Sequence, residues 1–337
     1  MVLACATEVW AQTITITTTR DPVDKSYRKM LQGMDLFETL RAMAPNASLR
    51  YKLLPLQRGT RMDGIVLEIV GATDRIPVPL APDHTFTLAR HQKALDEDAS
   101  VMPNRRERSM TWRTEVRTPG VAPNTRRLGD LRLECHVGME ADLVSKVGFL
   151  ASLVSNAVRR RRGFCDEGGG LYYFFSERPL FNVTMVAGTR REILPVDALY
   201  AGVIHDPQSE AELSLCDCQA LLDRTYFVPL GDRSWPDDTL IEFEYMDEAH
   251  GLHSSRDAIT IGKSTKADVM AALGKTAGTS FESGFEVWVY QFAGATPAKP
   301  SREKPAATEF VVLFAPSGVV SKTRIRPPPP PREAKGT

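Results

Sequence analysis

The sequence of 337 residues lacks the features that most directly identify a function. It has no apolar run near the roughly 20 residues that a membrane-spanning helix needs. Its 42 basic and 42 acidic residues balance, which argues against a general nucleic-acid-binding protein, because such proteins are usually basic. It also lacks a Gly-x-Ser-x-Gly elbow, a His-Glu-x-x-His motif and a Rossmann glycine pattern. From the sequence we therefore assign no catalytic residue, metal ligand, cofactor or nucleic-acid partner.

The residues that could carry chemistry are scattered along the chain. One close histidine pair, His250 and His253, falls in a Gly/Ser-containing segment that we expect to be a linker. Glu242 and Glu244 share one face of a predicted strand, which fits a solvated strand face. An enzyme would instead gather acidic and histidine side chains in one cleft: Asp237, Glu242, Glu244 and His205. An envelope hydrolase with its site in the β-rich middle of the chain is therefore the alternative function.

The first residues resemble the end of a secretory signal peptide. Val9-Trp-Ala11 fits a small-residue cleavage site before Gln12, so residues 1–11 are predicted to be a signal remnant. Cys5 ends a short apolar run that resembles a lipobox, in which this cysteine would carry a lipid. An ordinary cytosolic N-terminus is the third interpretation. We favour cleavage after Ala11 and expect a periplasmic protein, with association with the outer membrane or peripherally with a membrane as a further expectation.

Four cysteines would remain after cleavage, and an even number in an oxidising compartment predicts two disulfides. A bridge between Cys216 and Cys218 would be strained by its tight spacing. We therefore expect both to bridge outward, to Cys135 and Cys165. The alternative is a zinc site made of the Cys216-x-Cys218 pair with Cys165 and His205, although that spacing differs from the usual Cys-x₂-Cys knuckle.

Residues 12–138 are expected to form a helix followed by a β-sandwich-like domain. Residues 12–19 alternate Thr and Ile, which is typical of a strand. Asp21-Pro22 predicts a helix start, and Pro45 ends the helix. Its apolar face comprises Val23, Tyr27, Met30, Met34, Phe37 and Leu40. Strand-length runs then occur at residues 48–56, 64–71, 76–80, 85–90, 110–117 and 131–135. The basic runs 105–108 and 126–127 are interpreted as solvated loops.

Residues 139–250 are predicted to be an α+β middle region. A second amphipathic helix is expected at residues 139–162, with four arginines in its last turn and Gly163 as the stop. Further strands are expected at residues 171–175, 182–195 and 239–245. The second of these is interpreted as a hairpin around Ala187-Gly188.

The most regular stretch of the chain follows, where start, stop and period signals agree. Thr265 and Asp268 fit a capping box, and Gly274 stands where a helix stop requires positive φ. The helix between them would use its apolar contacts Val269, Met270, Ala272 and Leu273. Residues 285–292, 310–314 and 319–325 then read as three antiparallel strands.

Residues 255–326 resemble the SmpA/OmlA (BamE-type) family of small outer-membrane assembly lipoproteins. The match consists of the Ile-x-x-Gly-x-[Ser/Thr]-x-x-[Asp/Glu]-Val-x-x-x-Leu-Gly pattern at residues 259–274, Trp288-x-Tyr290, Phe314 and Gly318-Val-Val. Lys275 replaces a proline that the family usually has, and a Pro/Ala/Lys-rich insertion separates two strands. The resemblance implies the cell envelope and a role beside outer-membrane assembly, without a known chemistry.

These observations predict an α+β fold: an N-terminal helix with a β-sandwich-like region, a mixed middle, and a C-terminal helix with a three-stranded antiparallel sheet. The Pro-rich tail, residues 327–337, is expected to be disordered. The expected function is that of an exported cell-envelope protein acting by contact with an envelope protein partner. The aromatic strands would offer the binding face, through Trp288, Tyr290 and Phe292. An inhibitor-like module that uses these aromatic residues as anchors is a further alternative.

Overall fold

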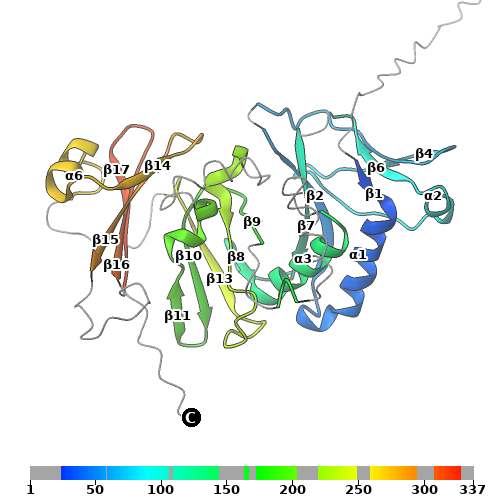
Figure 1. Cartoon of the computed structure of the whole chain (residues 1–337), viewed down its shortest axis with the longest axis horizontal. Coiled ribbons are helices and arrows are strands. Elements are labelled where there is room, and N and C mark those ends of the chain that lie inside the picture. The colour runs from blue at the N-terminus through cyan, green and yellow to red at the C-terminus, as the bar shows by residue number, and fades with distance from the viewer. Residues whose placement is uncertain are drawn as a thin grey trace, which may run out of the picture.

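The computed structural model describes residues 24–57, 59–105, 109–143, 163–166, 172–202, 219–248, 259–293 and 307–327. The α-helices are α1 Tyr27–Thr39, α2 Gln92–Asp96, α3 Leu128–Glu140 and α6 Lys266–Leu273. The strands are β1 Lys25–Ser26, β2 Ser48–Pro55, β3 Leu67–Val70, β4 Arg75–Val78, β5 Thr85–Phe86, β6 Ser100–Pro103, β7 Met110–Arg117, β8 Thr125–Arg127, β9 Phe174–Phe175, β10 Leu180–Ala187, β11 Arg190–Ile193, β12 Thr225–Tyr226, β13 Leu240–Tyr245, β14 Ala277–Ser280, β15 Glu286–Ala293, β16 Ala307–Phe314 and β17 Val320–Arg326. Figure 1 shows them as three groups along the long axis, running from the blue N-terminal end to the red C-terminal end.

The N-terminal group consists of two small sheets, β1-β6-β3-β4 and β5-β2-β7, which share one core with α1. Ser26 caps α1 by accepting a hydrogen bond from the Lys29 N–H at 3.4 Å. The expected start at Asp21 lies outside the described residues. Of the predicted apolar face, Tyr27, Met30 and Phe37 are buried and Met34 and Leu40 are half-buried, whereas Val23 lies outside the described residues.

Helix α3 corrects the sequence analysis, because the strand expected at residues 131–135 lies inside it. Leu131, Leu133 and Cys135 are fully buried, and the intervening Arg132 and Glu134 are buried as well. A helix that is buried on every side carries no apolar stripe of period 3.6. The Leu-Arg-Leu-Glu-Cys run of α3 alternates apolar and charged residues, which is the pattern expected of a strand. Most of the helix expected at residues 139–162 lies outside the described residues. The first two residues of that expected helix, Met139 and Glu140, are the end of α3.

The middle group is built on the antiparallel sheet β11-β10-β13-β8. The predicted hairpin is confirmed: Ala187 pairs with Arg190, and Gly188 has φ of 57° in the turn. In the same core, α3 and this sheet pack together with the short β12-β9 pair.

The C-terminal group begins with the predicted capping box at Thr265 and Asp268, in which both reciprocal hydrogen bonds are present. Its sheet has four strands, in the order β14-β15-β16-β17, instead of the expected three. The missed strand β14 is short, small and polar, so it has no apolar alternation to reveal it. Gly278 in β14 stands opposite Trp288, where an added Cβ would lie 2.5 Å from the indole Cδ1. The glycine therefore makes room for the indole ring.

Both faces of this C-terminal sheet are covered. Val287, Val289, Val311 and Leu313 belong to the core of the middle group, whereas the opposite face packs on α6 through Val269. On α6 itself, the expected contact Met270 is 43% exposed. Along β17 the Lys322 ammonium donates to the Tyr245 carbonyl at 2.7 Å, and further contacts join this strand to β10 and β11.

The expected fold class is therefore wrong. The chain is mostly β, with its described strands in five sheets and four α-helices among the described residues. Instead of one β-sandwich, the N-terminal group has two small sheets around α1, and the C-terminal sheet gains a fourth strand. No helix within the described ranges has the length and apolar character needed to cross a membrane. The tail from residue 328 and the strand expected at residues 12–19 lie outside those ranges.

Candidate functional site

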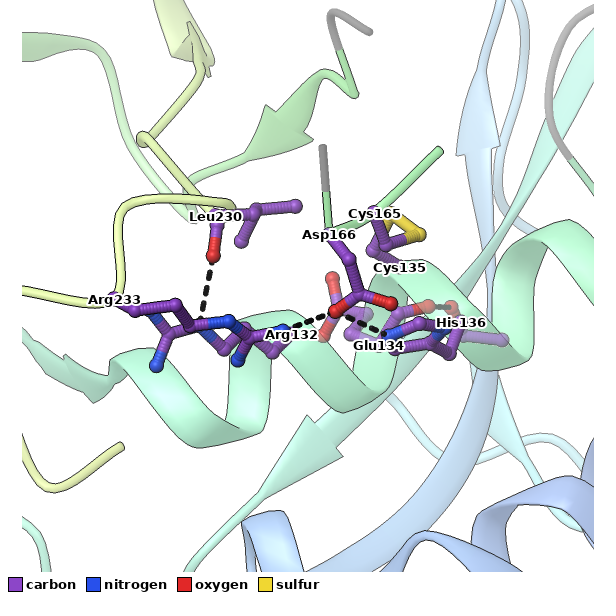
Figure 2. The surroundings of a disulfide bond; sticks show 9 residues. Arg132, Glu134, Cys135, His136, Cys165, Asp166, Leu230 and Arg233 are labelled. Atoms are coloured by element: carbon purple, nitrogen blue, oxygen red, sulfur yellow. Dashed lines mark hydrogen bonds and ion pairs between the residues drawn. A yellow bond between two sulfur atoms is a disulfide. The ribbon is translucent and has the colours of Figure 1, made fainter. Parts of the chain in front are cut away.

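Helix α3 is cross-linked at its buried centre. Cys135 forms a disulfide with Cys165, and both cysteines are buried. Figure 2 shows Asp166 beside this bond, between Arg233 and His136. Asp166 is ion-paired with Arg233, and its Oδ1 lies 3.6 Å from the His136 Nε2. Burial lowers the pKa of His136, against the opposing effect of Asp166.

The observed disulfide corrects the expected pairing, in which Cys135 and Cys165 would each bridge to Cys216 or Cys218. The latter two cysteines lie outside the described residues, as do Cys5 and His205. Because Cys165 is already bonded, the proposed zinc set that included it is also wrong. Within the described ranges, no group of three or more His, Cys, Asp or Glu side chains is placed to hold a metal ion.

The residue next to this disulfide, Glu134, forms an ion pair inside the protein. Its Oε2 lies 2.7 Å from the Arg126 Nη2, and it accepts the Val116 N–H at 3.0 Å. The same Arg126 nitrogen donates to the Val116 carbonyl at 2.8 Å. The side chains are only 3% and 8% exposed. Burial raises the pKa of the Glu134 carboxyl, against the opposing effect of Arg126. Because breaking such a pair would leave a buried charge, it fixes α3 against β7 and β8.

A polar cavity of about 310 Å³ opens in front of this pair, where the end of β7 meets β8, β9, β12 and β13. We call it the Arg117 pocket. It is lined by Arg117, Thr118, Val121, Ala122, Pro123, Asn124, Thr125, Arg126, Phe175, Ser176, Glu177, Tyr226, Phe243 and Tyr245. Its size falls at the lower end of the range for small-molecule sites.

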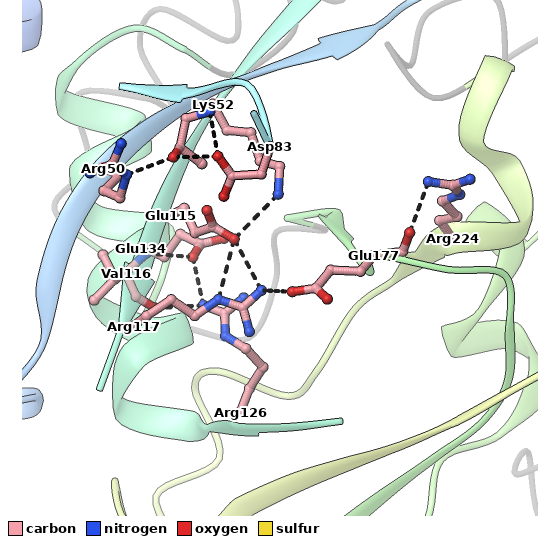
Figure 3. A network of polar contacts seen from close by, with 11 residues as sticks. Arg50, Lys52, Asp83, Glu115, Val116, Arg117, Arg126, Glu134, Glu177 and Arg224 are labelled. Carbon is pink, nitrogen blue, oxygen red and sulfur yellow. Dashed lines mark hydrogen bonds and ion pairs between the residues drawn. The ribbon is translucent and has the colours of Figure 1, made fainter. Parts of the chain in front are cut away.

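Arg117 lies at the mouth of the pocket between two carboxylates. Its Nη2 is 3.0 Å from Glu115 Oε1 and 3.1 Å from Glu177 Oε1. Figure 3 shows Glu177 reaching toward Arg117 from a different part of the chain. On the other side, Lys52 Nζ lies 3.5 Å from Glu115. Although burial opposes the charge, Lys52, Arg117 and Arg126 hold the pKa of Glu115 below its usual value.

Tyr226 contributes a buried hydroxyl to this pocket. Its Oη has no hydrogen-bond partner among the described residues, and the residue is 1% exposed. Its ring packs against Phe174 and Phe243, with ring centres 5.5 and 5.0 Å away. Burial raises the pKa of Tyr226, so the hydroxyl stays neutral and able to donate. A buried polar group without a partner costs about 1–3 kcal/mol, so this hydroxyl calls for an acceptor from outside the described chain.

The Nε of Arg126 is likewise buried and without a partner among the described residues. Both orphaned groups can donate a hydrogen bond, and Arg117 adds a charged donor at the mouth. The pocket is therefore suited to a ligand that presents oxygen acceptors.

The acidic residues that would mark a hydrolase do not converge. Asp237 lies 2.5 Å from Arg132, Glu242 lies 2.7 Å from Arg191, and Glu244 lies 3.1 Å from Lys322. The last member of that set, His205, lies outside the described residues, as does the histidine pair His250 and His253.

The aromatic residues nominated for partner binding lie in β15. Tyr290 is 5% exposed and its hydroxyl donates to the Gly274 carbonyl at 3.1 Å, so it is occupied within the module. Trp288 is half-buried, and its Nε1 donates to Glu286 at 2.5 Å. Phe292 is also half-buried and packs on the same core. These side chains mainly hold α6 on the sheet.

Sequence reasoning missed the residues of the Arg117 pocket. Arg126 was interpreted as part of a solvated basic loop, yet it is among the most buried charged residues of the described chain. Arg117, Glu177 and Tyr226 come from three separate segments, and no local pattern links them.

No family model, no curated protein and no solved structure matches this chain. The resemblance of residues 255–326 to the SmpA/OmlA family, like the domain boundaries, stays a prediction.

Proposed function

We propose that this chain is an exported cell-envelope protein that acts by binding a partner or ligand, and that the Arg117 pocket is its binding element. The observation that carries the proposal is the buried Tyr226 hydroxyl in the wall of a polar cavity, for which the described part of the chain supplies no hydrogen-bond partner. Native proteins rarely leave such a group unsatisfied, and a bound acceptor would satisfy it.

The disulfide supports the envelope as the place of action. Such bonds persist in oxidising compartments such as the periplasm and are rare in the cytosol. Cys135–Cys165 is buried in the central core, so it belongs to the folded structure. The resemblance of the C-terminal module adds a partner class, the outer-membrane assembly proteins, as part of the same proposal.

Binding at the pocket is tested with a library of small polar fragments, detected by ligand-observed NMR on the full chain. We expect hits whose signals weaken in Tyr226→Phe and Arg117→Ala. Glu192→Gln is the matched control, because Glu192 is an exposed carboxylate on β11 whose only partner among the described contacts is Arg190. Hits that are equally strong in all variants would place binding elsewhere and contradict the proposal.

Location is tested by intact mass and N-terminal sequencing of the protein from fractionated cells, with and without reductant. A periplasmic chain with the Cys135–Cys165 bond intact is the expected result. A cytosolic chain with both thiols free would overturn the envelope assignment without affecting the pocket.

A further inference from the structure

We infer that the ligand of the Arg117 pocket presents a carboxylate, and that Glu177 occupies its place on Arg117 in the free protein. This inference rests on the proposed binding function and names its ligand class. It follows from how Glu177 is held, from the charge balance of the pocket and from the position of the free donors.

The Glu177 carboxylate is attached to the pocket by a single partner. Its Oε1 contacts Arg117 at 3.1 Å, and no other side-chain contact of Glu177 is found within the described chain. The side chain is 64% exposed. Its backbone is fixed separately, because Arg224 Nη1 donates to the Glu177 carbonyl at 2.9 Å. The carboxylate can therefore swing into solvent while the strand end stays in place.

Glu115 differs from Glu177 in just these respects. Its side chain is 13% exposed and is held by Lys52 as well as Arg117. Exposed ion pairs contribute only about 0–1 kcal/mol, whereas a half-buried carboxylate with two cations is much harder to displace. Of the two carboxylates on Arg117, Glu177 is the one that a ligand can replace.

The charge balance favours a single negative charge on that ligand. In the free protein the ion pairs at and behind the pocket join three cations, Lys52, Arg117 and Arg126, to three carboxylates, Glu115, Glu134 and Glu177. Beside Lys52, Asp83 and Arg50 add one charge of each sign. When Glu177 swings out, one positive charge is left uncompensated. A carboxylate restores the balance, whereas a phosphate dianion would exceed it and would also approach Glu115.

Hydrogen-bonding geometry points the same way. Arg117 donates to Glu115 Oε1 from Nε at 3.2 Å and from Nη2 at 3.0 Å. Its other edge, Nη1 and Nη2, can pair with a ligand carboxylate through two parallel hydrogen bonds once Glu177 has left. The Tyr226 hydroxyl and the Arg126 Nε are closed to solvent, have no partner within the described chain and belong to residues of the pocket wall. They would serve a second oxygen of the ligand, such as a neighbouring carbonyl. A peptide C-terminus and a small organic acid both offer this chemistry.

The test uses calorimetric or NMR titration of the full chain with matched probes: acetyl-Ala-Ala as the free acid, the same dipeptide as its amide, propionate and inorganic phosphate. We expect the free acid to bind and the amide and phosphate to bind at least tenfold more weakly. Glu177→Gln is expected to tighten binding of the acid about two- to fivefold, as loss of an exposed competing ion pair predicts. Arg117→Gln is expected to abolish it, and Glu192→Gln to leave it unchanged.

The outcomes separate this inference from the proposed function. Binding of the free-acid dipeptide supports the inference. If propionate binds as well, the source is a small acid; if propionate does not bind, the source is a peptide terminus. If the acid and the amide bind equally and both lose affinity in Tyr226→Phe, the ligand class is wrong, whereas binding at the Arg117 pocket is supported. Tighter binding of phosphate, or no gain in Glu177→Gln, would also overturn the carboxylate. If no probe binds while polar fragments still bind at Tyr226, the carboxylate is again the part that is wrong.

Discussion

Two buried arginine–glutamate pairs in this protein are nearly equal in burial and differ in their surroundings. Arg126–Glu134 stands behind the Arg117 pocket, with side chains 3% and 8% exposed. Arg324–Glu309 lies between the C-terminal sheet and the middle group, with side chains 3% and 7% exposed. In both pairs the arginine Nε has no partner among the described residues.

The comparison shows that an unpartnered guanidinium N–H does not by itself identify a binding site. Arg324 uses its other nitrogens for structure: Nη1 donates to Asn182 Oδ1 at 2.8 Å and to the Leu194 carbonyl at 3.2 Å. What distinguishes the Arg126 side is the cavity and the second orphaned group, the Tyr226 hydroxyl. The first pair is therefore joined to a site, and the second fastens one sheet to another.

We expect the largest loss of stability when either arginine is removed. Arg126→Leu and Arg324→Leu should each destabilise the fold by about 3–5 kcal/mol, because each leaves a buried carboxylate without its cation. Chemical denaturation followed by circular dichroism measures this. In the double variants Arg126→Leu/Glu134→Leu and Arg324→Leu/Glu309→Leu, much of the loss should be recovered. Single variants as stable as the wild type would show that these pairs are not the anchors we describe.

The disulfide sharpens the contrast, since it lies next to Glu134 and has no described counterpart beside Glu309. Its cysteines are 30 residues apart, and closing a loop of that size contributes about 3–4 kcal/mol in the chain-entropy model. Cys135→Ala/Cys165→Ala should lose about that much stability, measured by the same unfolding experiment. Reductant should destabilise the wild type and leave the double variant unaffected; a wild type that is insensitive to reductant contradicts this prediction.

Local signals were predictable from the sequence, as the C-terminal helix illustrates. Its cap at Thr265, its partner Asp268 and its stop at Gly274, with φ of 81°, depend only on neighbouring residues. Helix α3 was not predictable in this way, because burial on all sides removes the period that identifies a helix. Its residues Arg132 and Glu134 are charged, yet they find partners inside the protein.

The candidate site was also beyond sequence reasoning, because its residues meet only after folding. Arg117 ends β7, Glu177 follows β9 and Tyr226 ends β12. The predicted disulfide pairing was wrong for a related reason. The tight spacing of Cys216 and Cys218 predicts that both bridge outward to Cys135 and Cys165, whereas the fold brings these last two together.

A smaller effect separates satisfied from unsatisfied hydroxyls. Tyr200→Phe should cost about 1–2 kcal/mol, because the Tyr200 hydroxyl donates to the buried Leu180 carbonyl at 2.7 Å. Tyr226→Phe should cost no stability in the absence of ligand and should stabilise the fold by up to about 1–3 kcal/mol, because it removes a buried hydroxyl that has no partner among the described residues. Thermal unfolding of both variants measures the difference. Equal losses would mean that the Tyr226 hydroxyl already has a partner, which would remove the main support for the pocket.

The smallest effect is a pH dependence confined to the pocket side. The pKa of Glu115 is held low in the folded protein, chiefly by Lys52 and Arg117 against the opposing effect of burial. Its ion pairs therefore contribute stability that is complete above the unfolded pKa of about 4.3 and is lost as pH falls through the lower folded pKa. We expect Glu115→Gln to be about 1 kcal/mol less stable than the wild type at neutral pH, with the gap closing below about pH 4. Both proteins keep Glu134, whose pKa is raised by burial and further by the Glu115 charge, so Glu115→Gln also removes a small part of this opposing pH dependence. Unfolding measured from pH 3 to 7 tests this, and a gap that stays constant over that range would mean that Glu115 is not held by its cations.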